Sequence, residues 1–102
     1  VTAVPADHGA LAPDAVGVVI TVDGIRVWQV GDSAYRPALW ADVFELGFDV
    51  IVLPINGAFG NLDGVEAARL AHDSGARVAI PCHFWTFPLH RGDPMEFLEA
   101  QG

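Results

Sequence analysis

Residues 48–81 read FDVIVLPINGAFGNLDGVEAARLAHDSGARVAIP and contain the clearest secondary-structure signals of the chain. Its first apolar run, residues 49–55, is typical of a buried strand, and the glycine-containing segment that follows predicts a loop. Asp63 and Glu66 have the spacing of a capping box, which marks the start of a helix. Residues 77–81 predict another buried strand. The stretch therefore predicts a strand, a loop, a helix and a second strand in that order.

On the amino-terminal side of this stretch, the sequence predicts three further strands. Residues 1–6 form one of them, and Pro5 favours an edge position because proline cannot donate to a sheet ladder. Residues 15–23 and residues 25–30 are β-rich runs on either side of Asp23-Gly24, which is a strong hairpin signal. These two runs should therefore pair antiparallel, and residues 9–14 between the first two strands should form a loop.

Two more helices are predicted. The first begins at Pro37 and ends before Gly47. Its apolar face consists of three residues at helical spacing, Leu39, Val43 and Leu46. The second begins at Pro94, with Asp93 as its cap, and runs through Ala100.

The resulting order is β-β-β-α-β-α-β-α, which implies an α/β fold with one sheet covered by helices on one face. At 102 residues the chain is a single small domain, residues 1–102. Hydrophobic residues make up 52% of it and charged residues only 18%, so the other sheet face should be apolar and uncovered. We expect a partner there, either a second copy of the chain or a missing amino-terminal half.

Composition excludes several classes of function. Five basic and 13 acidic residues give a net charge of −8, which disfavours nucleic acid as a partner. The longest apolar runs are shorter than the roughly 20 residues of a membrane span, so we expect no membrane association and no targeting segment. The single cysteine, Cys82, favours a reducing cytoplasm. The chain does not begin with Met, which suggests that it starts partway through a longer product.

Three candidate metal ligands each follow directly on a predicted strand: His8, Asp32 and His83. Because ligands bind beyond the carboxyl ends of strands in α/β proteins, these side chains should converge although they are far apart in sequence. Imidazole nitrogen and carboxylate oxygen suit divalent metals such as Zn²⁺ or Mn²⁺. Each residue also has an ordinary interpretation, since a histidine at a strand end is commonly a surface residue and Gly31-Asp32-Ser33 is a common turn sequence.

The segments VWQVGDSAYRP, FDVIVLPINGAFGNLDGVEAARLA and ARVAIPCHFWTFP together resemble the carboxyl-terminal half of metallo-β-lactamase-fold hydrolases. Gly31-Asp32-Ser33 with the Ile80-Pro81-Cys82-His83 ending is most similar to the branch that contains ascorbate-6-phosphate lactonase. The resemblance covers nearly the whole chain. It implies that the single sheet is half of an αββα sandwich, in which two sheets pack face to face with helices outside.

The resemblance also implies roles for the candidate ligands. His8 matches a ligand of a first metal, Asp32 the catalytic carboxylate that bridges two metals, and His83 a ligand of the second. Such a site uses water activated by Zn²⁺ or Mn²⁺, as two ions in the complete site, to hydrolyse a lactone or another ester of small-molecule size. The family's principal motif, His-x-His-x-Asp-His, is missing, since no two of the four histidines lie two residues apart. We therefore expect weak metal binding and no turnover without the missing half.

Four further residues are candidates for substrate binding: Asn56, Gly57, Asn61 and His90. Asn56, Gly57 and Asn61 follow a predicted strand end beside the proposed site, although asparagine and glycine are also ordinary turn formers. Cys82 alternates with His83 along a strand, so we expect its thiol to point into the core.

Two alternatives to the hydrolase remain open. One is a non-catalytic half-domain that self-associates through its apolar sheet face. The other is an unrelated α/β binding domain in which His8, Asp32 and His83 never meet.

Overall fold

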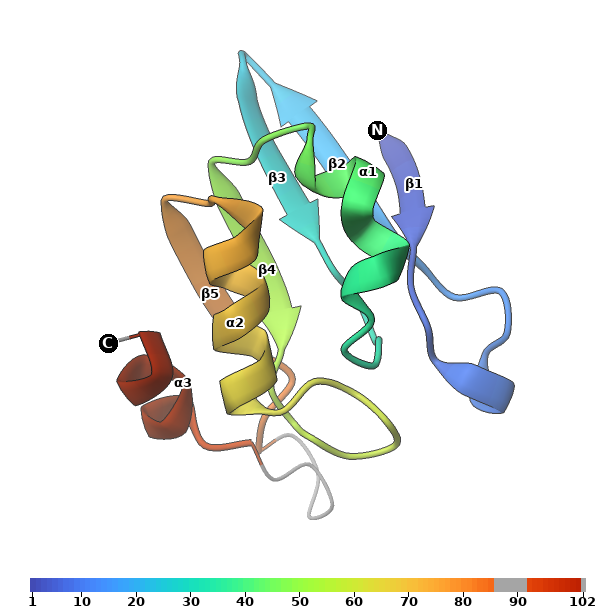
Figure 1. Cartoon of the computed structure of the whole chain (residues 1–102), viewed down its shortest axis with the longest axis vertical. Coiled ribbons are helices and arrows are strands. Elements are labelled where there is room, and N and C mark those ends of the chain that lie inside the picture. The colour runs from blue at the N-terminus through green and yellow to red at the C-terminus, as the bar shows by residue number, and fades with distance from the viewer. Residues whose placement is uncertain (86–91, 102) are drawn as a thin grey trace.

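The computed structural model describes residues 1–85 and 92–101, and its centre is a five-stranded sheet with the order β1-β2-β3-β4-β5 (Figure 1). The first three strands are antiparallel neighbours, whereas β3, β4 and β5 run parallel. The single sheet and the edge position of the first strand are as predicted. The strands are β1 Thr2–Pro5, β2 Val16–Val22, β3 Ile25–Gln29, β4 Val50–Pro54 and β5 Val78–Cys82.

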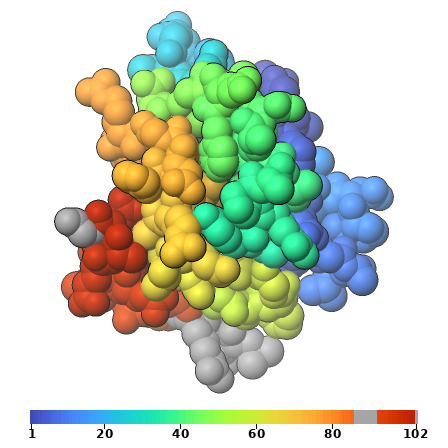
Figure 2. Space-filling model, viewed as in Figure 1, coloured from blue at the N-terminus to red at the C-terminus, as the bar shows by residue number. Residues whose placement is uncertain are grey.

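Helices α1 and α2 lie on the same face of this sheet, and α3 packs beside α2 (Figure 1). The space-filling view shows all three helices on the face turned toward the viewer (Figure 2). The α/β class with helices on one face is therefore confirmed. The helices are α1 Ala41–Phe44, α2 Gly64–Ser74 and α3 Pro94–Gln101, and two short 3₁₀ helices are η1 Gly9–Leu11 and η2 Pro37–Trp40.

The β2–β3 hairpin turns at Asp23-Gly24, as predicted. Val22 pairs with Ile25, and the two turn residues have φ angles of 51° and 79°. Positive φ at both positions is the requirement of a type I′ turn, whose twist matches that of the strands it joins. The dipeptide therefore sets the register of the hairpin.

The core lies between the sheet and the helices, and Trp28 is at its centre. This side chain is fully buried on β3, and its ring centroid lies 5.7 Å from that of Trp40 and 5.2 Å from that of Phe48. Ile51 and Leu53 on β4 are also fully buried on this face. Burying large aromatic and branched side chains contributes roughly 1.5–3 kcal/mol each, so this cluster fixes the helix layer on the sheet.

The helix predicted between Pro37 and Gly47 is wrong in its regularity and at two of the three residues of its apolar face, whereas Val43 is buried as predicted. A 3₁₀ turn comes first and the α-helical part is short. Leu39 and Leu46 are 43% and 44% exposed, whereas Trp40 is fully buried. Trp40 and Val43 are the buried side chains of this segment, so its inward face is set by Trp40 and Val43 and not by Leu39. Another 3₁₀ turn, η1, lies in the segment predicted as a loop.

The capping box at α2 is confirmed. The backbone nitrogen of Glu66 donates to Asp63 Oδ1 over 2.8 Å, and the backbone nitrogen of Asp63 donates to Glu66 Oε1 over 3.1 Å. Gly75 ends the helix with a φ of 72°. The helix α3 also starts as predicted, because the backbone nitrogen of Met95 donates to Asp93 Oδ1 over 2.9 Å.

The sheet face away from the helices is apolar and uncovered, as expected. Val78 and Ile80 on β5 are 51% and 46% exposed, and Val22 and Ile25 at the hairpin are 60% and 50% exposed. The prediction of a buried strand at β5 is therefore wrong, because β5 is an edge strand whose second face meets no helix. Within the described ranges, none of the helices has the length and apolarity to cross a bilayer.

Candidate metal site

The candidate residues lie beyond one edge of the sheet. The strand β1 is antiparallel to β2, β2 is antiparallel to β3, and β3, β4 and β5 are parallel, so β1, β3, β4 and β5 all point the same way. Their carboxyl ends therefore meet at a common edge. The chain segments that leave this edge carry the metal-ligand and substrate candidates of the sequence analysis.

Asp32 and His83 meet at this edge although 51 residues separate them. His83 Nε2 lies 3.2 Å from Asp32 Oδ1, and the two side chains are 28% and 46% exposed. The side-chain nitrogen of Asn61 donates to the same carboxylate oxygen over 3.4 Å. An imidazole, a carboxylate and an amide thus converge at a surface that solvent reaches.

His8 lies in a loop that is hydrogen-bonded to the loop of Asp32, but it does not complete a ligand cluster. The backbone oxygen of Asp7 accepts from the backbone nitrogen of Ala34 over 2.7 Å, which holds the two loops together. His8 Nδ1 is buried and lacks a hydrogen-bond partner in the structure. Across the described residues, no three His, Cys, Asp or Glu side chains are grouped closely enough to hold one ion. The structure therefore brings Asp32 and His83 together and leaves His8 adjacent.

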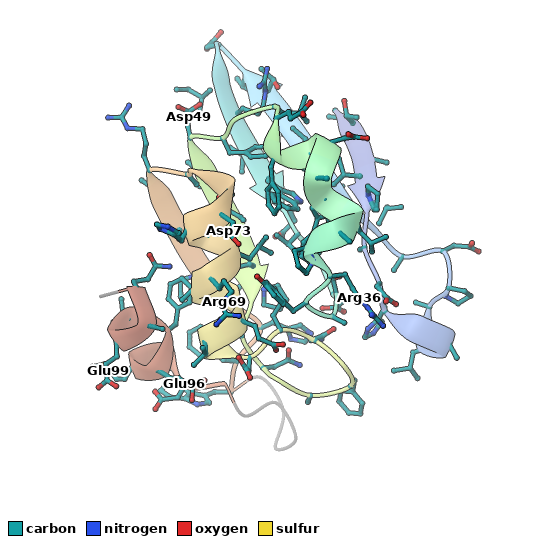
Figure 3. All side chains as sticks on the ribbon, in the orientation of Figure 1. Arg36, Asp49, Arg69, Asp73, Glu96 and Glu99 are labelled. Atoms are coloured by element: carbon teal, nitrogen blue, oxygen red, sulfur yellow. The ribbon has the colours of Figure 1, made fainter. Side chains whose placement is uncertain are left out.

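Sequence reasoning missed the residues that join the two ligand loops. Ser33 is fully buried, and its Oγ accepts from the backbone nitrogen of Asp7 over 2.9 Å. Arg36 Nε lies 2.9 Å from Asp7 Oδ2, and Figure 3 shows Arg36 beside the loop that follows β1. The hydrogen bond from the Gly9 backbone, and then that from Arg36, lower the pKa of Asp7. The sequence signal was Asp-x-Gly at residues 7–9, a pattern typical of an Asx turn.

The segment after β5 holds an unfavourable backbone conformation. His83 and Trp85 have φ angles of 62° and 56°, in the left-handed region that residues with a Cβ rarely adopt. Each such residue costs of order 1–3 kcal/mol, and these conformations concentrate at binding and catalytic sites. The conformation aims the imidazole of His83 toward Asp32 as the strand ends.

The substrate candidates on the loop after β4 are buried. Asn56 is 2% exposed and Asn61 is 6% exposed, and Gly57 has a φ of 60° that glycine tolerates best. Asn61 reaches Asp32, whereas Asn56 and Gly57 line a neighbouring pocket. His90 lies outside the described residues.

Cys82 is not the core residue that strand alternation predicted. It is only partly buried, and it belongs to the surroundings of Asp32. Burial raises the pKa of its thiol, and the negative charge of Asp32 raises it further. The thiol therefore stays protonated near neutral pH and is a poor nucleophile.

Asp32 and His83 are suited to share a divalent cation. Zinc bonds of about 2.0–2.2 Å place two ligand atoms of a tetrahedral site roughly 3.3–3.6 Å apart. The observed 3.2 Å lies just below this range, so a small side-chain adjustment would admit the ion. The orphaned Nδ1 of His8 is a further nitrogen at the same edge. The donor set fits part of a metal site, and full coordination requires more ligands than the described residues bring together.

Comparison with known proteins gives both sequence and structural relatives. No family model matches the chain. A UPF0173 metal-dependent hydrolase of Aeropyrum pernix is 39% identical over 95 residues, which is 91% of this chain and 38% of the relative. A UPF0173 metal-dependent hydrolase of Archaeoglobus fulgidus is 34% identical over 116 residues, which is 98% of this chain and 47% of the relative.

Two solved structures share the fold. Igni18, a metallo hydrolase of Ignicoccus hospitalis, has a TM-score of 0.76 and 29% identity, covering 97% of this chain and 43% of that chain. A Thermotoga maritima protein described as a Zn-dependent hydrolase of the metallo-β-lactamase superfamily has a TM-score of 0.68 and 28% identity, covering 82% and 44%. The chain thus spans less than half the length of the proteins it matches.

Proposed function

We propose that this chain, a homologue of the UPF0173 metal-dependent hydrolases, supplies part of a metal-dependent site that hydrolyses an ester or a lactone. Its fold is that of the metallo-β-lactamase superfamily. In this proposal Asp32 and His83 bind one divalent metal, and Asp32 and His8 contribute to a second. The homology confirms the resemblance to metallo-β-lactamase-fold hydrolases and does not extend to the lactonase branch. The substrate, the metal and the ligand assignments are the proposal.

The observation that carries this proposal is the 3.2 Å approach of His83 Nε2 to Asp32 Oδ1 at the carboxyl edge of the sheet. Asn61 donates to that carboxylate and holds it in place. Because the Asp32 side chain is 46% exposed, a cation from solvent can reach the carboxylate. A bound divalent cation polarises an ester carbonyl and lowers the pKa of water toward neutrality.

Metal titration tests the ligand set. We expect Zn²⁺ to bind more tightly than Mn²⁺, since imidazole and carboxylate sites generally follow that order. His83→Ala and Asp32→Asn should each weaken Zn²⁺ binding by at least about tenfold, because loss of even a supporting partner costs about 10–100-fold. His72→Ala is the matched control, since His72 is an exposed histidine on α2. Unchanged Zn²⁺ affinity in both the His83→Ala and the Asp32→Asn variants would contradict the proposed metal site.

The chain alone should hydrolyse no lactone, because catalytic zinc typically has about three protein ligands and the described residues do not bring three together. The assay is lactone hydrolysis with saturating Zn²⁺, with and without the remaining segment of a UPF0173 relative supplied in trans. Activity that requires the added segment supports the proposal. Absence of activity in both mixtures, with Zn²⁺ bound, contradicts the lactonase assignment.

A second candidate is a non-catalytic domain that self-associates through the uncovered sheet face. The observation in its favour is the row of exposed apolar residues across β2, β3 and β5, Val22, Ile25, Val78 and Ile80. A patch of this kind on a monomer marks an interface. Analytical ultracentrifugation of the chain and of Ile80→Lys tests this candidate: a dimer that Ile80→Lys dissociates supports it, and a monomer at all concentrations contradicts it. We also propose a cytoplasmic location, which the free thiol of Cys82 favours.

A further inference from the structure

A pocket of about 550 Å³ opens beside the candidate metal site. It is bounded by the end of β4, the start of α2, the segment after β5 and the start of α3. Its volume lies in the range of small-molecule sites, about 300–1,000 Å³. The residues that give it chemical character are Asn56, Gly57, Asp63, Trp85, Asp93 and Glu96.

Two chain segments touch both this pocket and the metal-ligand pair. The loop after β4 contributes Asn56 to the pocket and Asn61 to Asp32. The segment after β5 contributes Trp85 to the pocket and His83 to Asp32. A ligand held in the pocket therefore lies next to the residues proposed to bind metal.

Asn56 is the buried polar group that determines which hydrogen-bonding groups a ligand of this pocket must carry. It is 2% exposed, and neither its Nδ2 nor its Oδ1 has a hydrogen-bond partner in the structure. A buried unsatisfied polar group costs about 1–3 kcal/mol, so a ligand that satisfies it gains that free energy. The carboxamide both donates and accepts, and its ligand must offer an acceptor and a donor.

The charges around the pocket further restrict the chemical class of ligand that it can bind. Among the described residues that line it, three are carboxylates, Asp63, Asp93 and Glu96, and none is basic. Asp63 and Asp93 are held in place by their capping hydrogen bonds. These groups repel a phosphate or a carboxylate and accept hydrogen bonds from donors. An ammonium group would satisfy the carboxylates, but it has no acceptor for the Asn56 nitrogen.

Hydroxyl groups meet both requirements, because each is a donor and an acceptor. Trp85 adds an apolar surface on which the C–H face of a sugar ring can pack, and its side chain is exposed at the pocket. We propose that this pocket binds an uncharged polyhydroxylated group, such as a sugar ring. Calling that group part of the substrate rests on the proposed hydrolase function, whereas its binding does not.

The test is a fluorescence titration of the metal-free chain with myo-inositol, with inorganic phosphate and with methylammonium at equal ionic strength. Trp28 and Trp40 are fully buried and Trp85 is 69% exposed, so a ligand in the pocket changes chiefly the emission of Trp85. We expect a saturable change with myo-inositol only, and Trp85→Phe should remove it. Tighter binding of phosphate or of methylammonium overturns the proposal.

Two substitutions check the residues. Asn56→Leu removes unsatisfied polar atoms, so it should fold at least as stably as the parent chain while weakening inositol binding by at least about tenfold. Glu96→Gln should weaken binding, whereas Glu99→Gln should not. Both glutamates are on α3, with Glu96 toward α2 and Glu99 on the side away from it (Figure 3). Equal effects of the two glutamate variants, or full affinity in a folded Asn56→Leu chain, contradict the pocket.

The same titrations separate the two proposals. If inositol does not bind but Zn²⁺ binding depends on His83, this inference is contradicted and the proposed metal site is supported. If inositol binds but Zn²⁺ affinity is the same in the His83 and Asp32 variants as in the parent chain, the pocket is supported and the proposed metal site is contradicted.

Discussion

Ser33 Oγ lies 2.9 Å from the backbone nitrogen of Asp7 and accepts its hydrogen bond. The hydroxyl donates in turn to the backbone oxygen of Ala34 over 2.9 Å, and the backbone oxygen of Ser33 accepts from Leu62 over 2.9 Å. One fully buried residue therefore joins the loop of His8, the loop of Asp32 and the loop after β4. The relative position of the candidate ligands depends on this residue.

Ser33→Ala should lower the free energy of unfolding by about 1–3 kcal/mol, because it leaves the Asp7 backbone N–H unpaired. It should also weaken Zn²⁺ binding by about tenfold or more, since supporting hydrogen bonds orient metal ligands. Chemical denaturation and metal titration measure the two effects.

The matched control is Ser74→Ala. Ser74 is also buried and makes two backbone hydrogen bonds, to Ala71 over 2.7 Å and from Ala76 over 3.2 Å, at the far end of α2. This variant should lose stability and keep its Zn²⁺ affinity. Equal losses of affinity in both variants would show that Ser33 acts through general stability alone.

Asp63→Ala should destabilise the chain by about 0.5–2 kcal/mol, because it removes the cap that accepts from the Glu66 backbone. Asp63→Asn should stay close to the parent stability, since asparagine is an equally good cap. Urea denaturation followed by circular dichroism distinguishes the two variants. If both variants lose the same stability, the charge of Asp63 matters and its capping role does not.

The pKa of Tyr35 should lie above its ordinary value of 10.0, because burial disfavours the phenolate and Asp73 adds a negative charge nearby. The ring also lies under Arg69, whose guanidinium carbon is 5.9 Å from the ring centroid. Figure 3 shows Arg69 and Asp73 together on α2. Since Tyr35 is the single tyrosine, the ultraviolet absorbance of tyrosinate reports its titration alone.

Asp73→Asn should shift this titration to lower pH, and Asp42→Asn on α1 should leave it unchanged. The sign for stability follows from linkage. The unfolded chain loses the tyrosine proton at lower pH than the folded chain does. The stabilisation that the protonated Tyr35 gives to the folded chain is therefore fully present below pH 10.0 and is lost as the pH rises above that value. A Tyr35 titration at or below its ordinary value would contradict the burial seen here.

Gly17→Ala should destabilise the chain by about 1–3 kcal/mol through overpacking. A Cβ at this position of β2 would lie 2.8 Å from the backbone oxygen of Val30 and 2.9 Å from that of Gln29. These acceptors belong to the backbone and cannot rotate away. Thermal unfolding measures the effect, and a melting temperature equal to that of the parent would mean that β2 and β3 are farther apart than the structure shows.

Local signals in the sequence determined much of the fold. Asp23-Gly24 set the hairpin, Asp63 and Glu66 set the start of α2, and Asp93-Pro94 set the start of α3. Each of these signals acts within a few residues, through turn geometry or a capping hydrogen bond, so a single sequence suffices to recognise it. The family resemblance was visible for the same reason, because its segments are continuous.

Which faces are buried and which side chains meet depends on how the elements pack together. Leu39 and Ile80 are exposed although the sequence pattern predicted burial, because exposure depends on which element covers the residue. The pairing of Asp32 with His83 depends on the parallel crossover from β3 through β4 to β5, and the Ser33 link depends on the same packing. Contacts between residues tens of positions apart are set by the packing of whole elements, which local sequence pattern does not encode.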